Sequence, residues 1–179
     1  MRLLLHSCCA PCSAAVIENL LAEGLRPTLF YFNPNIYPSE EYNLRKAECS
    51  HYARLLDLDF IDGDYDHAAW RGQMTGLEKE PERGRRCLAC FKLRLAVTAS
   101  VAAARGFDTI ATTLSSSRWK DLKQINEAGA CAVAPYEGMN FLARNWRKGG
   151  LSERRRILIR ENLFYNQTYC GCEFSRRDP

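Results

Sequence analysis

Seven of the nine cysteines in this sequence occur in three short groups. The groups are CCAPC with Cys8, Cys9 and Cys12, CLAC with Cys87 and Cys90, and CGC with Cys170 and Cys172. A C-x-x-C spacing lets two thiolates converge on one metal centre, and the free amides at a helix start favour their negative charge. Since the thiol pool of a reducing compartment keeps disulfides open, this cysteine usage indicates metal binding or redox chemistry.

Two kinds of metal centre fit the first two groups. Cys9, Cys12, Cys87 and Cys90 could hold a structural zinc ion through four thiolates. The adjacent pair Cys8 and Cys9 favours an iron–sulfur cluster, because consecutive side chains cannot easily chelate one tetrahedral ion but can reach two irons of a cubane. The residues alone leave both readings open, with the cluster preferred.

The remaining cysteines suggest different roles. A disulfide between Cys170 and Cys172 would close a small, strained ring that is easily reduced, which suits an electron relay better than a structural staple. A second metal-ligand pair or a reduced tail are the alternatives. Cys49 lies on an apolar helix stripe and Cys131 within an expected strand, so both are expected to be buried apolar residues.

Short β-like runs alternate with longer helical patterns along the chain. The expected strands cover residues 2–7, 28–33, 59–65, 109–114 and 131–136, and the expected helices cover 12–22, 39–56, 87–105, 119–128 and 151–163. Gly24 and Gly106 are expected to cap two of these helices in a left-handed conformation. The alternation predicts an α/β fold with a mainly parallel sheet flanked by helices on both faces. Ligands bind such folds beyond the carboxyl ends of the strands, and Cys8, Cys9 and Cys12 lie where nucleotide-binding proteins place a phosphate loop.

Length and composition predict one domain over residues 1–179. The chain has 179 residues, of which 46% are hydrophobic, and a net charge of +4. Its apolar runs are far shorter than the roughly 20 residues of a membrane span, and its start lacks the apolar core of a secretory signal. We therefore expect a cytoplasmic protein with no membrane partner. Lysine and arginine residues are concentrated at 82–87, 144–150 and 153–160. The last two stretches make the segment from about 140 to 179 basic, and this segment also contains cysteines.

Several weaker features have two interpretations each. The basic stretches and neighbouring aromatic residues fit either a nucleic-acid surface or ordinary solvated helix charges. The hydroxyls of SSSRWK (115–120) and Lys120 could contact phosphate or substrate, although a helix N-cap explains the serines equally well. His6 could hydrogen-bond cluster sulfurs, but a satisfied core histidine is the favoured reading.

Six segments together resemble one known family. They are LLLHSCCAPCS, FYFNPNIYPSEEYNLRK, RGRRCLACFKLRL, GFDTIATTL, NWRKGG and YNQTYCGCEFS, in chain order. Through them the sequence resembles the cobalamin-independent epoxyqueuosine reductases called QueH, over nearly its whole length. The family looks like the HUP class of Rossmann-type α/β domains, which agrees with the alternation of strands and helices.

The resemblance implies a reaction and its cofactors. The reaction is the two-electron reduction of epoxyqueuosine, at the wobble position of a tRNA anticodon, to queuosine in the last step of queuosine biosynthesis. A 4Fe-4S cluster is implied at Cys8, Cys9, Cys87 and Cys90, without cobalamin. Cys170 and Cys172 correspond to a redox-active pair, and an adjacent mononuclear metal, expected to be iron, has Cys12 as its candidate ligand. Some members carry aspartate at that position.

The reaction also needs partners and a proton source. We expect an electron-donor system as a partner, and tRNA contacts at Lys120, Arg147 and Lys148. Asp64 and Asp66, beyond the third expected strand, are candidate proton donors to the departing oxygen.

Two other functions compete with this one. The first is a zinc-stabilised HUP protein that modifies tRNA or adenylates a substrate. Such a protein is expected to carry a loop such as S-G-G-x-D-S after the first strand, where this chain has SCCAPCS. The second is a non-enzymatic iron–sulfur carrier.

Overall fold

A five-stranded parallel sheet organises the computed structural model, which describes residues 1–176. The strands are β1 (Leu3–His6), β2 (Thr28–Tyr31), β3 (Phe60–Asp62), β4 (Thr109–Thr112) and β5 (Asn140–Phe141). They are arranged in the order β3-β2-β1-β4-β5, and every neighbouring pair is parallel. This is the strand order of Rossmann-type folds, so the predicted α/β class is confirmed.

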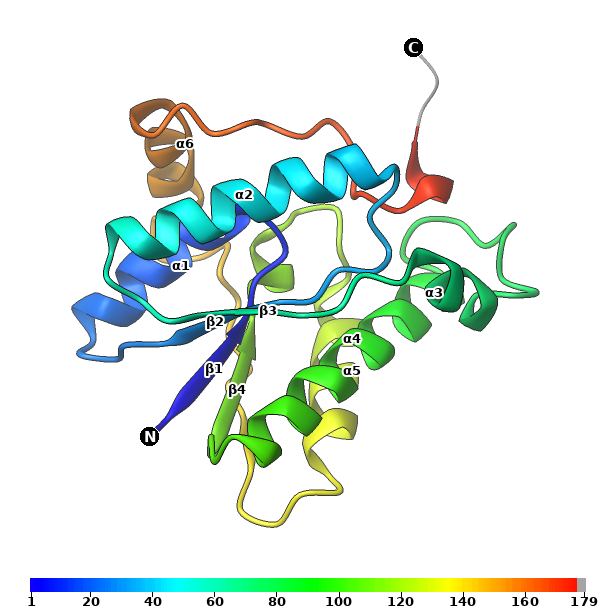
Figure 1. The fold of residues 1–179 in the computed structure, drawn as a ribbon, viewed down its shortest axis with the longest axis horizontal. Coiled ribbons are helices and arrows are strands. Elements are labelled where there is room, and N and C mark those ends of the chain that lie inside the picture. The colour runs from blue at the N-terminus through cyan, green and yellow to red at the C-terminus, as the bar shows by residue number, and fades with distance from the viewer. Residues whose placement is uncertain (177–179) are drawn as a thin grey trace.

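Helices cover both faces of the sheet. One face carries α1 (Ala10–Ala22), α2 (Ser39–Leu55) and α6 (Leu151–Glu161), and the other carries α3 (His67–Gln73), α4 (Arg85–Ala104) and α5 (Leu122–Val133), as Figure 1 shows. Side chains of β1 point alternately to the two layers, so Leu3 and Leu5 pack on the α1 side and Leu4 on the α4 side. Gly24 and Gly106 have φ values of +77° and +69°, which confirms their predicted left-handed caps.

The chain after α6 runs beside α2 toward α3 (Figure 1). Tyr165 fixes this path, because its backbone N–H donates to Glu48 and its hydroxyl donates to Glu41 of α2. The segment therefore passes over the carboxyl ends of the strands and delivers residues 166–172 to that edge. Residues 177–179, the end of the expected basic segment, lie outside the described residues.

The expected strand over 131–136 is wrong. Helix α5 continues to Val133, and the fifth strand is the short Asn140–Phe141. A short apolar run does not distinguish a helix end from a strand, and here Ile125, Ala128 and Ala132 form a buried stripe at helical spacing. Cys131 consequently lies on the outer side of α5 and is exposed, which corrects its predicted burial.

Helix α3 has no counterpart among the predicted elements. Its N-cap is Asp66, whose carboxylate accepts a hydrogen bond from the backbone N–H of Ala69. The helix buries Trp70 against α4. A helix of 7 residues with Trp70 as its buried side chain has too little hydrophobic periodicity to be predicted from the sequence.

Helix α4 is long and apolar enough to cross a membrane by length and composition alone. It is the one such helix among residues 1–176. In the fold it lies on the sheet beside α5, and Phe91, Leu95 and Ala99 are buried in that layer. Its apolar character is accounted for by packing.

Gly129 of α5 permits the close approach of this helix to β5. A Cβ atom at residue 129 would lie 2.2 Å from the Cε1 atom of Phe141. We expect Gly129→Ala to lower the free energy of unfolding by about 1–3 kcal/mol, as overpacking does, and to lower the urea midpoint accordingly. Gly72→Ala is the control, because no heavy atom of residues 1–176 lies within 4 Å of a Cβ there and alanine is the better helix former. Equal midpoints for both variants would contradict the prediction.

Candidate functional site

The candidate site lies where the strand order reverses, between β1 and β4. In open α/β sheets the loops after such strands diverge and leave a crevice for a ligand. Here the loop after β1 leads directly into α1, with Cys9 as the N-cap residue. The backbone N–H of Cys8 donates to Thr113 Oγ1 across 3.2 Å, which fastens this loop to the one that follows β4.

Three thiols converge at the start of α1. The Sγ atoms of Cys8, Cys9 and Cys12 all lie within 4.8 Å of one another, and all three residues are buried. Burial raises the pKa of Cys9, whereas hydrogen bonds from the Cys8 and Cys9 thiols hold the pKa of Cys12 well below its usual range. Negative charge is therefore favoured on Cys12 over Cys9. Convergent soft sulfur donors suit zinc or an iron–sulfur cluster rather than a hard cation.

The CLAC cysteines lie near the start of α4, and neither lines the cavity that the trio shares. Cys87 packs against the apolar cluster that contains Cys8, Cys9 and Cys12, and its Sγ accepts a hydrogen bond of 3.3 Å from the backbone N–H of Arg83. Cys90 is buried in a separate small cluster with Trp70, Met74 and Cys172. Burial raises the pKa of both Cys87 and Cys90. Their role as cluster ligands beside Cys8 and Cys9 stays a prediction.

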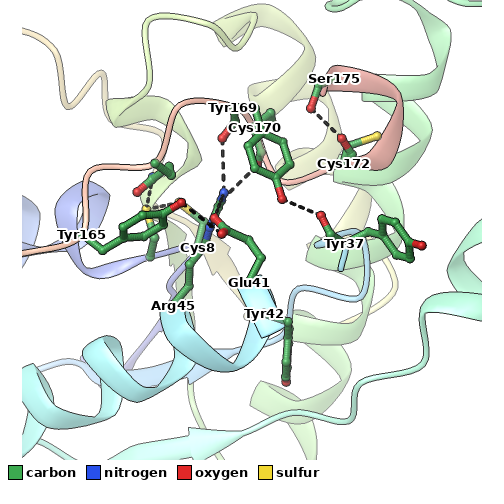
Figure 2. Close-up of polar contacts among 12 residues, drawn as sticks. Cys8, Tyr37, Glu41, Tyr42, Arg45, Tyr165, Tyr169, Cys170, Cys172 and Ser175 are labelled. Atoms are coloured by element: carbon green, nitrogen blue, oxygen red, sulfur yellow. Dashed lines mark hydrogen bonds and ion pairs between the residues drawn. The ribbon is translucent and has the colours of Figure 1, made fainter. Parts of the chain in front are cut away.

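The CGC segment is anchored by its backbone. Arg45 of α2 donates to the carbonyl oxygens of Tyr169 and Cys170, each across 3.3 Å (Figure 2). Gly171 has φ +107°, and a Cβ atom there would lie 2.9 Å from Ile36 Cγ1, so glycine is required at this turn. Cys170 and Cys172 are free thiols, and their proposed redox pairing stays a prediction.

A cavity of about 620 Å³ opens in front of the three convergent thiols. Its wall also contains Cys170, Asn33, Asn35 and several serines. The cationic side chains that line it are Arg45, Arg94, Arg118, Lys120, Arg147, Arg155 and Arg156. Within residues 1–176, no aspartate or glutamate lines this cavity. Such a wall is suited to an anionic ligand.

The three predicted tRNA contacts occupy different positions. Lys120 lines the cavity and is only 8% exposed. Burial opposes its charge, but Cys170, Cys8 and Cys12 favour the ammonium more strongly and raise the pKa of Lys120 above its ordinary range. Lys148 is exposed and lies outside the cavity wall.

Arg147 lines the cavity and also holds a loop. Its Nε donates to the carbonyl oxygen of Ser115 across 3.1 Å, and one Nη donates to that of Lys120 across 2.7 Å. A guanidinium has five N–H donors, so these two bonds leave donors for a ligand. Arg147 therefore positions the backbone of Lys120, and its contact with RNA stays a prediction.

Asp64 and Asp66 are exposed and do not line the cavity. His6 is buried at the end of β1, 2.9 Å from Thr112 Oγ1 through Nδ1 and 3.1 Å from the Phe32 carbonyl oxygen through Nε2. Burial lowers the pKa of His6 to about 3, so the ring is neutral. Because a carbonyl oxygen only accepts, Nε2 carries the proton, and the favoured reading of a satisfied core histidine is confirmed.

Sequence reasoning missed three residues that support the thiol loop. Gln167 Nε2 lies 2.7 Å from Cys9 Sγ, so this amide donates to a thiol of the trio. Arg94 of α4 is buried and donates to the side-chain oxygen of Asn33, whose amide donates in turn to the carbonyl oxygen of Ser7 across 3.0 Å. No spacing marks Arg94 or Asn33, because they meet only in the folded chain.

Comparison with solved structures agrees with the fold. The predicted subunit of a tRNA methyltransferase from Methanocaldococcus jannaschii superposes with a TM-score of 0.56 at 15% identity, over 89% of this chain and 75% of that one. The protein is thus of the Rossmann-type α/β class, with a thiol-lined, basic cavity at the switch point of its sheet.

Sequence comparison identifies the family. The family described as epoxyqueuosine reductase QueH matches residues 3–178. Curated members from Haemophilus influenzae and Acinetobacter baylyi are 45% and 44% identical, each over 99% of this chain and over 72% and 81% of their own lengths. A member from Thermotoga maritima is 34% identical over 96% of this chain and 88% of its own length. The chain belongs to the QueH family of epoxyqueuosine reductases.

Proposed function

We propose that this chain reduces epoxyqueuosine in a tRNA anticodon to queuosine, the last step of queuosine biosynthesis. The observation that carries the proposal is the cavity that combines the convergent thiols Cys8, Cys9 and Cys12 with a cationic wall to which residues 1–176 contribute no carboxylate. The thiols provide a place for a metal cofactor, and the cationic wall provides one for an RNA strand. Since tRNA is the substrate, the chain would act in the cytoplasm without a membrane partner.

The proposed cofactors are those that the family resemblance implies, and the convergence of Cys8, Cys9 and Cys12 supports a metal centre. Cys8, Cys9, Cys87 and Cys90 would hold a 4Fe-4S cluster, and Cys12 would contribute to an adjacent mononuclear iron site, with no need for cobalamin. When bound, the cluster would supply single electrons that it receives from a donor system. The iron, when bound, would act as a Lewis acid toward the epoxide oxygen. Gln167 would hold the Cys9 sulfur through its amide donor, as outer groups around metal ligands do.

The rim of the cavity offers a platform for a nucleobase. Trp119 lines the cavity and is 38% exposed, with the guanidinium carbon of Arg118 5.9 Å from its ring centroid. Arg83 donates to the carbonyl oxygens of both Trp119 and Arg118, at 3.1 and 2.8 Å, and so fixes the rim. Aromatic rings stack on unpaired bases, and chemistry on a base requires that it leave its stack. Trp119 would receive a base of the anticodon loop beside the reacting one.

The proposal predicts different consequences for two neighbouring basic residues. Lys148→Ala is expected to weaken tRNA binding and to reduce its salt dependence by about one unit of slope for each lost phosphate contact. Arg147→Ala is expected to weaken tRNA binding in the same way. It should also reduce turnover at saturating tRNA, because the hydrogen bond from Arg147 to the Lys120 carbonyl oxygen is lost. Binding titrations at several salt concentrations and single-turnover assays separate the two effects. An unchanged salt slope in both variants would exclude these residues from the RNA interface.

The function is tested with anaerobically purified protein and tRNA that carries epoxyqueuosine. Iron, sulfide and zinc analysis is followed by EPR after dithionite reduction and by nucleoside analysis of the treated tRNA. About four irons with matching sulfide, an excess iron and queuosine as product would support the proposal. One zinc ion without sulfide, even after reconstitution, would favour the zinc-stabilised protein. A stable cluster with no product would favour the carrier.

A further inference from the structure

Lys120 carries a buried charge without a bonded partner. Its side chain lines the cavity, and its ammonium makes no hydrogen bond or ion pair with any residue in the range 1–176. Taking an ammonium out of water is costly unless an acceptor replaces the water. A buried cation that lines an open cavity is therefore suited to bind an oxygen atom of a ligand.

The backbone around Lys120 is fixed on both sides. Its N–H donates to the carbonyl oxygen of Ser117 across 3.3 Å, and its carbonyl oxygen accepts the 2.7 Å bond from Arg147. The next residue, Asp121, is the N-cap of α5 and accepts hydrogen bonds from the backbone N–H groups of Lys123 and Gln124. These contacts fix the backbone at residue 120 and so hold the base of its side chain at the cavity wall.

The proposed reaction creates a need for such a donor. Both C–O bonds of the epoxide break, a carbon–carbon double bond forms, and the oxygen leaves as water. Two electrons from a one-electron reductant and two protons from solvent complete the balance. Negative charge develops on the oxygen before it is protonated, so a hydrogen-bond donor near that oxygen lowers the barrier.

The cavity offers few groups for this task. The described residues of its wall contain no carboxylic acid, and of its cationic side chains only Lys120 carries an ammonium. Two of the guanidiniums already donate within the protein, Arg147 to two carbonyl oxygens and Arg94 to Asn33, although each keeps further N–H donors. Lys120 donates none of its three ammonium N–H groups to any residue of the described part of the chain, and it shares the cavity wall with Cys8 and Cys12.

We propose that the Lys120 ammonium is the catalytic donor that binds the epoxide oxygen and stabilises the negative charge on it as the C–O bonds break. This inference rests on the proposed function. Lys120 keeps its proton in this role, and the same ammonium would distinguish the epoxide from the alkene product, which has no oxygen at that position.

The test uses RNA anticodon stem-loops that carry either epoxyqueuosine or queuosine. Dissociation constants for both, the single-turnover rate, the iron content and the reduction potential are measured for the wild type, Lys120→Gln and Lys120→Arg. Lys92→Gln is the matched control, because Lys92 lies on α4, away from the cavity wall, in an exposed ion pair with Glu127.

The wild type is expected to bind the epoxide stem-loop about tenfold more tightly than the alkene one, as a charge-assisted hydrogen bond allows. Lys120→Gln should remove this preference and lower the rate by about 100-fold or more, as loss of an oxyanion donor does. Its iron content and reduction potential should match those of the wild type. Lys120→Arg should keep part of the preference and the rate, and Lys92→Gln should resemble the wild type.

Two results would overturn the inference. One is a Lys120→Gln variant that keeps the preference for the epoxide stem-loop and the wild-type rate. The other is a loss of iron or a shifted potential with the preference intact, because Lys120 would then only neutralise the thiols. If Lys120→Gln does not fold, the wild-type affinities decide, because equal dissociation constants for the epoxide and alkene stem-loops contradict the inference. Failure of the proposed function itself is distinct, since the wild type would then convert no epoxide.

Discussion

Replacing Cys9 by serine is expected to leave the protein without its metal centre and to reduce turnover to background. Cys9 is the N-cap of α1, is 1% exposed, and its Sγ lies within 4.8 Å of those of Cys8 and Cys12. A serine hydroxyl is a hard, weak ligand for iron or zinc and cannot replace a thiolate. Iron and sulfide analysis of the anaerobically purified variant, together with the assay on epoxyqueuosine tRNA, measures the loss.

Cys131→Ser is the matched control for this prediction. Cys131 is exposed on α5 and belongs to no cysteine group, so its loss should leave metal content and turnover unchanged. A Cys9→Ser protein with the full iron and sulfide content would contradict the assignment of Cys9 as a ligand. It would direct attention to Cys170, which lines the same cavity as the trio.

The position of the thiol loop was predictable, because it depends on chain topology alone. Alternating strands and helices imply a parallel sheet, and the loop after its first strand must lie at the carboxyl edge. The sequence therefore placed Cys8, Cys9 and Cys12 at the binding edge, and the structure confirms that they converge there. The mistaken strand over 131–136 did not affect this result, since that region lies beyond the switch point.

The cationic cavity was not predictable in the same way. Its side chains come from separate elements, including Arg45 on α2, Arg94 on α4 and Arg155 on α6. Charge patterns indicated a basic C-terminal half, but periodicity cannot tell which arginine turns inward when a helix packs. Arg94 reads as one more basic residue of an amphipathic helix, and only the fold places it 2% exposed beside Asn33.

The last prediction concerns the second cysteine pair. Cys170→Ser and Cys172→Ser are each expected to reduce multiple turnover by about 100-fold while iron content and tRNA binding stay unchanged. If the two thiols relay electrons through a disulfide, each is useless without the other, so the double variant should be no worse than either single one. Turnover assays of the three variants, with thiol titration of the wild type before and after oxidation, measure this.

Cys170 and Cys172 differ in their position relative to the cavity, and this difference predicts the order in which the two thiols react. Cys170 lines the large cavity, whereas Cys172 packs against Trp70 and Cys90, and burial raises the pKa of Cys172 to about 12. A thiol that stays protonated attacks slowly, so in a disulfide relay Cys170 would react with a partner first and Cys172 would resolve the mixed disulfide. Independent, additive losses in the two single variants would exclude a shared disulfide. If Cys172→Ser kept the wild-type turnover while Cys170→Ser lost it, Cys170 would instead be assigned to the metal site.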